Sequence, residues 1–403
     1  MSRAASSRSC ASRAGAALAT VGMLLALTAC GATSQDAADS PTGSDAAGES
    51  GAPVASALED RYDERFPEPL IDPDEVRSGG PPPDGIPPLD DPSFVPAPEV
   101  DFLEPDEGVL SLTVAEETRA YPLRVMTWHE IVNDTVGGVP VAVTYCPLCN
   151  SGVAFEREVE GQVLSFGTSG MLYANNLVMY DRQSESLWPQ LTGQASIGTM
   201  TGQQLRAIPM GVVAWSDFTA VHPDALVLSQ DTGFDRPYGS NPYVGYDDVD
   251  GDLIFPQPDE LDERLPVKQR VVGISDGSTS IAYVRESLAG ADPVQVELGD
   301  LDLVLWHVPG QRSALDAPEV AEGAQIGSVG VFEPVVDGQS LTFETVEGGF
   351  RDRETGSTWS VLGTATAGEL AGSTLPGYPH DDTFWFAWVT FHPDTDVREA
   401  PAH

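Results

Sequence analysis

The stretches "MYDRQSESLW" at residues 179–188 and "FRDRETGSTW" at residues 350–359 decide the fold, because one pattern occurs in both. Each contains Asp-Arg-x-Ser/Thr-x-Ser-x-Trp at the same internal spacing. Further matches lie in the same order on either side, and ordered matches at a nearly constant offset are the signature of an internal duplication. They are "RAYP" (119–122) with "IAYV" (281–284), "GQVLSF" (161–166) with "GQSLTF" (338–343), and "HPD" at 222–224 with "HPD" at 392–394.

The duplication divides the folded part of the chain into two tandem related halves, which we place at residues 107–268 and 269–398. In both halves, short segments rich in β-branched and aromatic residues alternate with glycine-rich turns, which is typical of strands. Helices are expected only at 122–133, where proline stands near the first turn, and at 213–222 with its counterpart at 385–392. The sequence therefore predicts a mainly β fold of the α+β type with few helices.

The polar residues of the repeated pattern resemble a catalytic set, but their duplication favours a structural role. A pattern at the same place in both halves is expected to be a folding signature, with aspartate and arginine bracing a turn and tryptophan in the core. The same reasoning places His222 and His392 at the end of a helix. Function is expected where one half has a feature that the other lacks. The repeated residues are Asp181, Arg182, Ser186 and Trp188, and Asp352, Arg353, Ser357 and Trp359.

The N-terminal third of the sequence predicts export and anchoring. Residues 1–29 resemble a lipoprotein signal peptide, because three arginines precede a short apolar run, and the "LTACG" that follows resembles a lipobox in which Cys30 carries the lipid. Residues 30–64 are mostly small or acidic and predict a flexible acidic tether. Residues 65–106 are rich in proline and predict an extended segment that packs on the domain. We therefore expect an extracytoplasmic protein, lipid-anchored to the outer face of the cell membrane.

The charge excludes one class of partner. The chain has 62 acidic and 20 basic residues, for a net charge of −42. A chain this acidic repels phosphate backbones, so nucleic acid is not an expected partner. The membrane, reached through the N-terminal lipid, is the one partner that the sequence predicts.

The stretch "VTYCPLCNSG" at residues 143–152 differs between the halves, because the second half has no cysteine at the corresponding place. With Cys10 in the signal peptide and Cys30 acylated, Cys146 and Cys149 are the only thiols of the mature chain. A turn and a strand follow them, whereas a thioredoxin-type motif opens a helix. The pattern resembles instead the knuckle of rubredoxins and zinc ribbons, in which both thiolates face one metal ion.

His129 is the leading candidate for a third metal ligand, because its helix immediately precedes the strand that delivers Cys146. Two thiolates and one imidazole suit zinc or copper better than calcium or magnesium. Glu130 and Asn133 are candidates to orient such a site. The alternative for His129 is a core histidine with satisfied hydrogen bonds. His307 and His380 are further candidate ligands.

Two loops are secondary candidates. The stretch "GTSGMLYANNLVMYDR" (167–182) is longer than its counterpart in the second half, and extra loops often carry binding residues. Its Tyr173, Asn175 and Asn176 either line a pocket or form a turn. The acidic stretch "DDVDGD" (247–252) lacks the full calcium-loop pattern and is interpreted as a solvated turn.

Three function classes remain open from these residues. The first is a cell-envelope lipoprotein that binds zinc or copper through Cys146, Cys149 and His129. The second is an extracytoplasmic thiol–disulfide oxidoreductase that uses the two cysteines. The third is a non-catalytic surface binding module in which they form a local disulfide.

The chain resembles the bacterial family known as domain of unknown function 3179. The resemblance extends from "DGIPPLDDPSF" (84–94) to "WFAWVTFHPDT" (385–395), and its most specific stretches are "WHEIVNDTVGGVPVAVTYCPLCNSGVAF" (128–155) and "SLWPQLTGQASIG" (186–198). Asn150 stands where glycine is common. The resemblance implies a secreted or lipid-anchored bacterial protein and implies no particular reaction.

Overall fold

The computed structural model describes residues 55–257 and 260–401. The predicted signal peptide, the predicted lipid-attachment residue Cys30 and most of the predicted tether lie outside these ranges. Within them, no helix combines the length and the apolar character that a membrane span needs.

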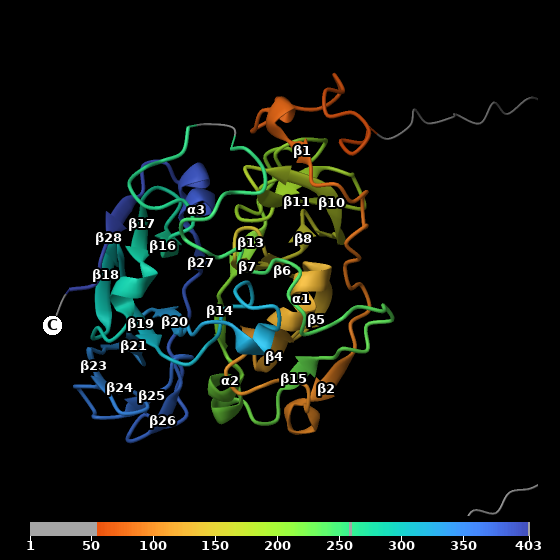
Figure 1. Cartoon of the computed structure of the whole chain (residues 1–403). Helices are drawn as coiled ribbons and strands as arrows, with labels where there is room; N and C mark the ends of the chain where they lie inside the picture. Colours follow the sequence, from red (N-terminus) through yellow and green to blue (C-terminus); the bar gives the residue numbers. More distant parts are fainter. Residues whose placement is uncertain (1–54, 258–259, 402–403) are drawn as a thin grey trace, which may run out of the picture. The chain divides into compact units, whose positions relative to one another are not determined.

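The fold is mainly β, as the sequence predicts (Figure 1). The α-helices within the described ranges are α1 (Leu123–His129), α2 (Trp215–Val221) and α3 (Trp385–Phe391). Single 3₁₀ turns occur at η1 (Pro73–Glu75), η2 (Ala97–Glu99), η3 (Arg285–Leu288) and η4 (Val320–Glu322).

The strands fall into two consecutive series. The N-terminal segment and the first half contain β1 (Arg77–Ser78), β2 (Phe94–Pro96), β3 (Gly108–Val114), β4 (Glu117–Pro122), β5 (Ile131–Val136), β6 (Val139–Cys146), β7 (Ser151–Glu156), β8 (Glu158–Val159), β9 (Gln162–Val163), β10 (Phe166–Tyr173), β11 (Asn176–Asp181), β12 (Leu187–Pro189), β13 (Arg206–Ile208), β14 (Met210–Ala214) and β15 (Leu226–Leu228). The second half contains β16 (Arg270–Ser275), β17 (Ser280–Val284), β18 (Val294–Leu298), β19 (Leu301–Val308), β20 (Ser328–Phe332), β21 (Val335–Val336), β22 (Gln339–Ser340), β23 (Phe343–Val346), β24 (Gly349–Asp352), β25 (Thr358–Trp359), β26 (Ala365–Ala367), β27 (Asp381–Phe384) and β28 (Asp396–Arg398).

The two halves have sheets of the same connectivity. In the first half β14 and β4 flank β3 in antiparallel fashion, and β15 joins β4 in parallel. In the second half β27 and β17 flank β16 antiparallel, and β28 joins β17 in parallel. Figure 1 shows the strands of the second half gathered on one side of those of the first. This agreement supports the predicted duplication, which remains an inference from the sequence repeats.

The repeated pattern folds into the same turn twice. The buried carboxylate of Asp181 accepts hydrogen bonds from Ser184 N at 2.6 Å, Ser186 N at 3.2 Å and Trp188 Nε1 at 3.0 Å. Asp352 accepts the equivalent bonds from Thr355, Ser357 and Trp359. The aspartate therefore braces the turn and both tryptophans are fully buried. The arginine is not its partner, however, because Arg182 pairs with Asp84 and Asp90.

The first helix is shorter than the prediction of 122–133. Helix α1 ends at His129, and Glu130 has a φ of 60°, which breaks the helical run. The β-branched residues that follow pair with β6 as strand β5. Tertiary pairing of Ile131 and Val132 therefore overrides the helix that their spacing predicts.

The N-terminal segment packs more closely than expected. Ala57, inside the predicted tether (30–64), is fully buried and its amide donates to Glu185 O at 3.2 Å. The small side chain allows this close approach, so the chain already lies against the folded domain at Ala57, within the predicted tether. Farther on, Leu89 is buried and its backbone bonds to Ile131 and Asn133, which holds the proline-rich segment against β5.

The halves meet along two strand contacts. Strand β14 packs beside β20, and β7 packs beside β27. Because β14 corresponds to β27 and β7 to β20 in the order of elements, the two contacts are equivalent under exchange of the halves. The interface is therefore built twice from the same pair of elements.

Candidate functional site

The two cysteines lie in the tight turn between β6 and β7. Cys146 is the last residue of β6 and pairs with Ser151, the first residue of β7. The turn closes through Cys149 N to Cys146 O at 3.2 Å and Asn150 N to Pro147 O at 3.2 Å. Asn150 has a φ of 52°, and asparagine is one of the few residues other than glycine that adopt this conformation readily. The hairpin therefore places both sulfurs on one short turn.

The turn between β10 and β11 covers the sulfurs. Cys149 Sγ lies 3.5 Å from Asn175 O, and Asn176 Nδ2 donates to Cys149 Sγ at 3.4 Å. The Asn175 side chain bonds to both backbone groups of Phe255, at 2.9 Å and 3.0 Å, which fixes the turn. Cys146 is 1% exposed and Cys149 is 0% exposed, so any reaction partner must first displace this cover.

The surroundings of the two thiols shift their pKa values in opposite directions. Burial raises the pKa of Cys146, but hydrogen bonds from the Cys149 thiol and from backbone amides, including that of Leu177, outweigh burial, so its pKa falls below the ordinary value. Burial and the neighbouring Cys146 thiolate raise the pKa of Cys149 well above its ordinary value. Cys146 is therefore the more acidic of the two thiols, and the first proton that the pair loses comes from Cys146.

A buried carboxyl group stands beside the pair. Glu130 is 6% exposed, and its carbonyl accepts a hydrogen bond from Tyr145 N at 2.8 Å, which places it diagonally across the ladder from Cys146. Burial, followed by the negative charge of Cys146, raises the pKa of Glu130 well above its ordinary value. Its positive φ is uncommon for glutamate and marks a locally strained position. The Glu130 carboxyl group therefore gives up its proton less readily than an ordinary glutamate.

His129 is engaged elsewhere. Its Nδ1 lies 2.6 Å from Pro87 O and its Nε2 lies 2.5 Å from Tyr238 Oη. Both ring nitrogens are thus used by protein groups. Within residues 55–257 and 260–401, no three His, Cys, Asp or Glu side chains are grouped so that they could hold a metal ion. Zinc or copper binding therefore stays a prediction that the geometry of His129 does not favour.

The other predicted residues lie at varying distances from the thiols. The Asn133 amide bonds to both backbone groups of Phe166, at 2.8 Å and 2.9 Å, and has a structural role. The Tyr173 ring lies 6.0 Å from the Phe391 ring. His307 bonds to Ile326 O at 3.0 Å, and His380 bonds to Tyr378 O at 2.9 Å. In the acidic stretch 247–252, Asp247 pairs with the buried Arg270 at 2.9 Å.

The sequence prediction missed a buried polar network behind the turn. Gln190 accepts hydrogen bonds from Ser151 Oγ at 2.9 Å and Asn176 Nδ2 at 3.0 Å, and donates to Thr144 Oγ1 at 2.9 Å. It therefore ties the strands on both sides of Cys146 to the covering hairpin. Gln190 lies two residues after Trp188, and the corresponding residue of the second half is Val361. This difference between the halves could have marked Gln190 as a candidate site residue.

Two tyrosines from the connection between the halves complete the surroundings of the thiols. Burial raises the pKa of both Tyr243 and Tyr246, and the charge of Cys146 raises both further. Tyr246 packs in the same buried cluster as Cys146 and Cys149. No local pattern in the sequence marks either residue.

The model of a family described as "Protein of unknown function (DUF3179)" matches residues 83–395. The chain belongs to this family. The match confirms the resemblance predicted from residues 84–395 and covers the thiol turn, its cover and both halves of the DUF3179 domain. No curated protein and no solved structure matches the chain.

Proposed function

We propose that this DUF3179 protein is a thiol–disulfide oxidoreductase of the cell envelope, with Cys146 as the attacking thiolate. One observation carries the proposal: amides and the neighbouring thiol donate hydrogen bonds to Cys146, which lowers its pKa in spite of complete burial. A lowered thiol pKa beside a second cysteine is characteristic of exchange-active pairs.

The proposed reaction starts with Cys146 as a thiolate and with Cys149 and Glu130 protonated, which agrees with the directions of their pKa shifts. The Cys146 thiolate attacks one sulfur of a small disulfide, the substrate S–S bond breaks, and the leaving thiolate takes the proton of Glu130. Glu130 then accepts the proton of Cys149, and the Cys149 thiolate attacks the Cys146 sulfur. The second substrate thiolate leaves and takes a proton from solvent. The substrate disulfide is reduced to two thiols, and Cys146 and Cys149 are oxidised to one disulfide.

The burial of both sulfurs limits which disulfides can react with Cys146. A folded protein substrate cannot reach Cys146 beneath Asn175 and Phe255, whereas a low-molecular-weight disulfide needs only local displacement of the turn 174–175. We therefore expect exchange with small disulfides such as oxidised glutathione to be faster than exchange with folded protein disulfides.

The test is a redox titration of the folded protein in glutathione buffers, read by alkylation of free thiols and mass spectrometry. Two thiols are expected to disappear together and reversibly. Cys149→Ser is expected to accumulate a mixed disulfide at Cys146, while Cys146→Ser is expected to accumulate none. The proposal is overturned if the native thiols stay reduced across the titration while urea-unfolded protein is oxidised.

Glu130 has a separate test. Glu130→Gln keeps the shape of the side chain but removes the proton that it transfers, so the exchange rate is expected to fall by about 10²–10⁴-fold. Glu158→Gln provides a matched control, because it makes the same chemical change at an exposed residue of β8. Equal rates for wild type and Glu130→Gln would remove Glu130 from the mechanism.

Metal binding is the second candidate, favoured by the same amide–sulfur hydrogen bonds, which also occur around metal-bound thiolates. Zinc or copper would be held by Cys146 and Cys149, and a tetrahedral zinc ion would need two more ligands. Elemental analysis of protein purified without chelator, compared with Cys146→Ser, tests this function. Metal in equal amounts in the two proteins, or in neither, would refute it.

We also propose that the protein is anchored through a lipid on Cys30. The proposal rests on the signal-like residues 1–29 and the lipobox-like sequence that ends at Cys30. Mass spectrometry of the N-terminal peptide is expected to show acylation, and Cys30→Ala is expected to remove it. An unmodified N-terminal peptide that begins elsewhere would refute the anchor.

A further inference from the structure

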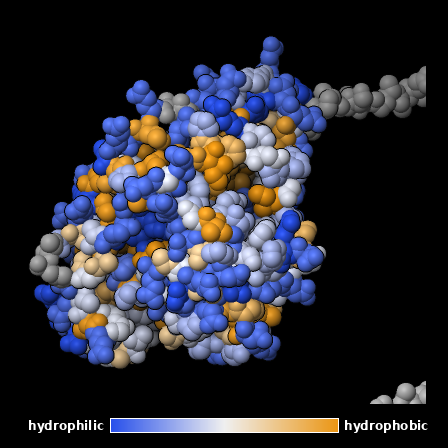
Figure 2. Space-filling model, in the orientation of Figure 1, coloured by the Kyte–Doolittle hydropathy of each residue, from blue (hydrophilic) through white to orange (hydrophobic). Residues whose placement is uncertain are grey.

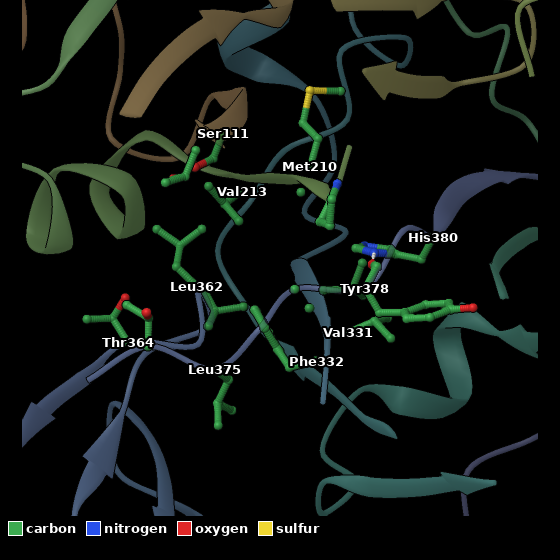
Figure 3. Close-up of a pocket in the computed structure, with 18 of the residues that line it drawn as sticks. Ser111, Met210, Val213, Val331, Phe332, Leu362, Thr364, Leu375, Tyr378 and His380 are labelled. Carbon is green, nitrogen blue, oxygen red and sulfur yellow. Dashed lines mark hydrogen bonds between the residues drawn. The ribbon is translucent and has the colours of Figure 1, made fainter. Parts of the chain in front are cut away.

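A groove runs along the interface between the two halves, and neither Cys146 nor Cys149 lines it. Its wider part is a cavity of about 260 Å³ and its narrower part a cavity of about 110 Å³. Met210 and His380 line both parts, so the two cavities adjoin. Figure 3 shows the wider part, with Met210 and Val213 from the first half facing Phe332 and Leu362 from the second.

The groove follows the internal repetition of the fold. Strand β14 and helix α2 occupy the same positions in the first half as β27 and α3 in the second. His222, at the end of α2, lines the wider part, and its counterpart His392, at the end of α3, lines the narrower part. The two parts are therefore equivalent sites of the two halves, and differences between them are informative.

The chemical difference lies at two adjacent positions. Counting back from the repeated tryptophan that opens α2 and α3, Met210 corresponds to His380 and Gly211 corresponds to Asp381. The first half thus presents a thioether and no side chain where the second half presents an imidazole and a carboxyl group. At these two positions, acid–base groups are therefore present in the second half and absent from the first.

The two polar groups are available to a ligand. His380 uses Nδ1 to bond to Tyr378 O at 2.9 Å, and no described residue bonds to its Nε2. Asp381 borders the narrower part, and its Oδ1 is buried without a hydrogen-bond partner among the described residues. Burial, followed by the charge of Asp382, raises the pKa of Asp381 to about 7. A buried acceptor without a donor is costly, and a ligand that donates a hydrogen bond removes that cost.

The buried arginine beside the neighbouring Asp382 does not fill this role. Arg285 pairs with Asp382 at 3.0 Å, and its other nitrogens donate to the carbonyls of Ile326 and Gly327. Among the described residues no ion pair with Asp381 is formed, so Asp381 is open to a cation from outside the chain.

The wider part of the groove favours a ligand with an apolar group. Its walls are predominantly aliphatic and aromatic, from Val213 in the first half and Val331, Phe332, Leu362 and Leu375 in the second. Burying an apolar group between them is favourable in proportion to the area covered. The net charge of −42 also concentrates small cations near the protein.

We propose that the groove binds a small organic amine with an apolar body, its ammonium nitrogen at Asp381 and its body between Val213 and Leu362. His380 lies between the two parts and accepts a second hydrogen bond from the same nitrogen through Nε2. This site does not include Cys146 or Cys149. A negative result for amine binding would therefore leave the proposed thiol chemistry untouched.

The test is isothermal titration of the purified protein with octylamine, octanol and octanoate, which share one apolar chain and differ in the polar end. Octylamine is expected to bind saturably, at least ten-fold more tightly than octanol, and octanoate more weakly still. Asp381→Asn is expected to weaken octylamine at least ten-fold while leaving octanol unchanged. Equal affinities for octylamine and octanoate, or no saturable binding of any of the three, would overturn the proposal.

A second variant keeps the test decisive if Asp381→Asn does not fold. Gly211 lines the wider part, and a Cβ built there meets no atom closer than 3.9 Å, so Gly211→Leu extends into the cavity without a backbone clash. It is expected to abolish binding of octylamine and octanol alike, with the thermal midpoint kept within a few degrees. Undiminished octylamine binding by a folded Gly211→Leu protein would place the ligand elsewhere and overturn the site.

Discussion

The repeated turn around Asp181 makes a quantitative prediction about stability. Replacing Asp181 with alanine removes the acceptor for Ser184, Ser186 and Trp188 at once. Trp188 is fully buried, so Trp188 Nε1–H loses its partner without gaining water, and the buried Ser186 N–H keeps only a 3.3 Å bond to Ser184 Oγ. At about 1–3 kcal/mol for each buried donor left unsatisfied or weakly bonded, Asp181→Ala lowers the free energy of unfolding by about 2–6 kcal/mol.

Urea denaturation followed by far-ultraviolet circular dichroism measures this loss. With an m-value of about 3 kcal/mol/M, the midpoint falls by about 1–2 M. Asp352→Ala is expected to cost a similar amount, because Asp352 accepts the equivalent bonds in the second half. Arg353→Ala is the control, since its side chain is 61% exposed and it makes only a distant ion pair at 3.8 Å. A loss below about 1 kcal/mol for both aspartate variants would refute the structural role assigned to the pattern.

Three further predictions concern other buried groups. Burial raises the pKa of Asp352, but hydrogen bonds from Trp359 and from the turn lower it more, so the net shift is downward. The stability that Asp352 contributes is therefore present above about pH 4 and is lost as the pH falls through the lowered pKa. The unfolding free energy of Asp352→Asn is expected to fall less steeply with acid than that of wild type. Gly273→Ala is expected to destabilise by about 1–3 kcal/mol in urea, because its Cβ would lie 2.3 Å from the Trp388 ring, whereas Gly211→Ala is expected to be neutral. Lys268, the single lysine, is 2% exposed and donates to Tyr246 O at 2.7 Å, so mass spectrometry is expected to find it acylated by an amine-directed reagent only after unfolding.

Local sequence patterns predicted the class of fold and two of the helices well. The repeats placed helices at 213–222 and 385–392, close to α2 and α3, because a tryptophan and an "HPD" turn mark both ends. Helix α1 was predicted too long, since nothing local shows that Ile131 and Val132 pair with β6. Whether a β-branched segment continues a helix or starts a strand depended here on a partner strand that comes later in the chain.

The candidate site was predicted in part for the same reason. Asn175 and Asn176 were selected because their loop is longer than its counterpart, and the structure brings both to the sulfurs. His129 was selected because it lies close in sequence to Cys146, but its ring is held by Pro87 and Tyr238 from segments outside the hairpin. The positive φ of Glu130 depends on where α1 stops, which the sequence alone did not show.

The connectivity of the two main sheets has a consequence for how the chain acquires its structure. Val109 of β3 pairs with Val213 of β14, and Val271 of β16 pairs with Thr383 of β27. Each sheet thus closes only after about a hundred intervening residues have become available. Non-local pairing of this kind makes folding slow and leaves strand edges unpaired in the meantime. Because the chain is synthesised from its N-terminus, β3 stays exposed until β14 follows, so transient protection by a chaperone is expected to raise the folding yield.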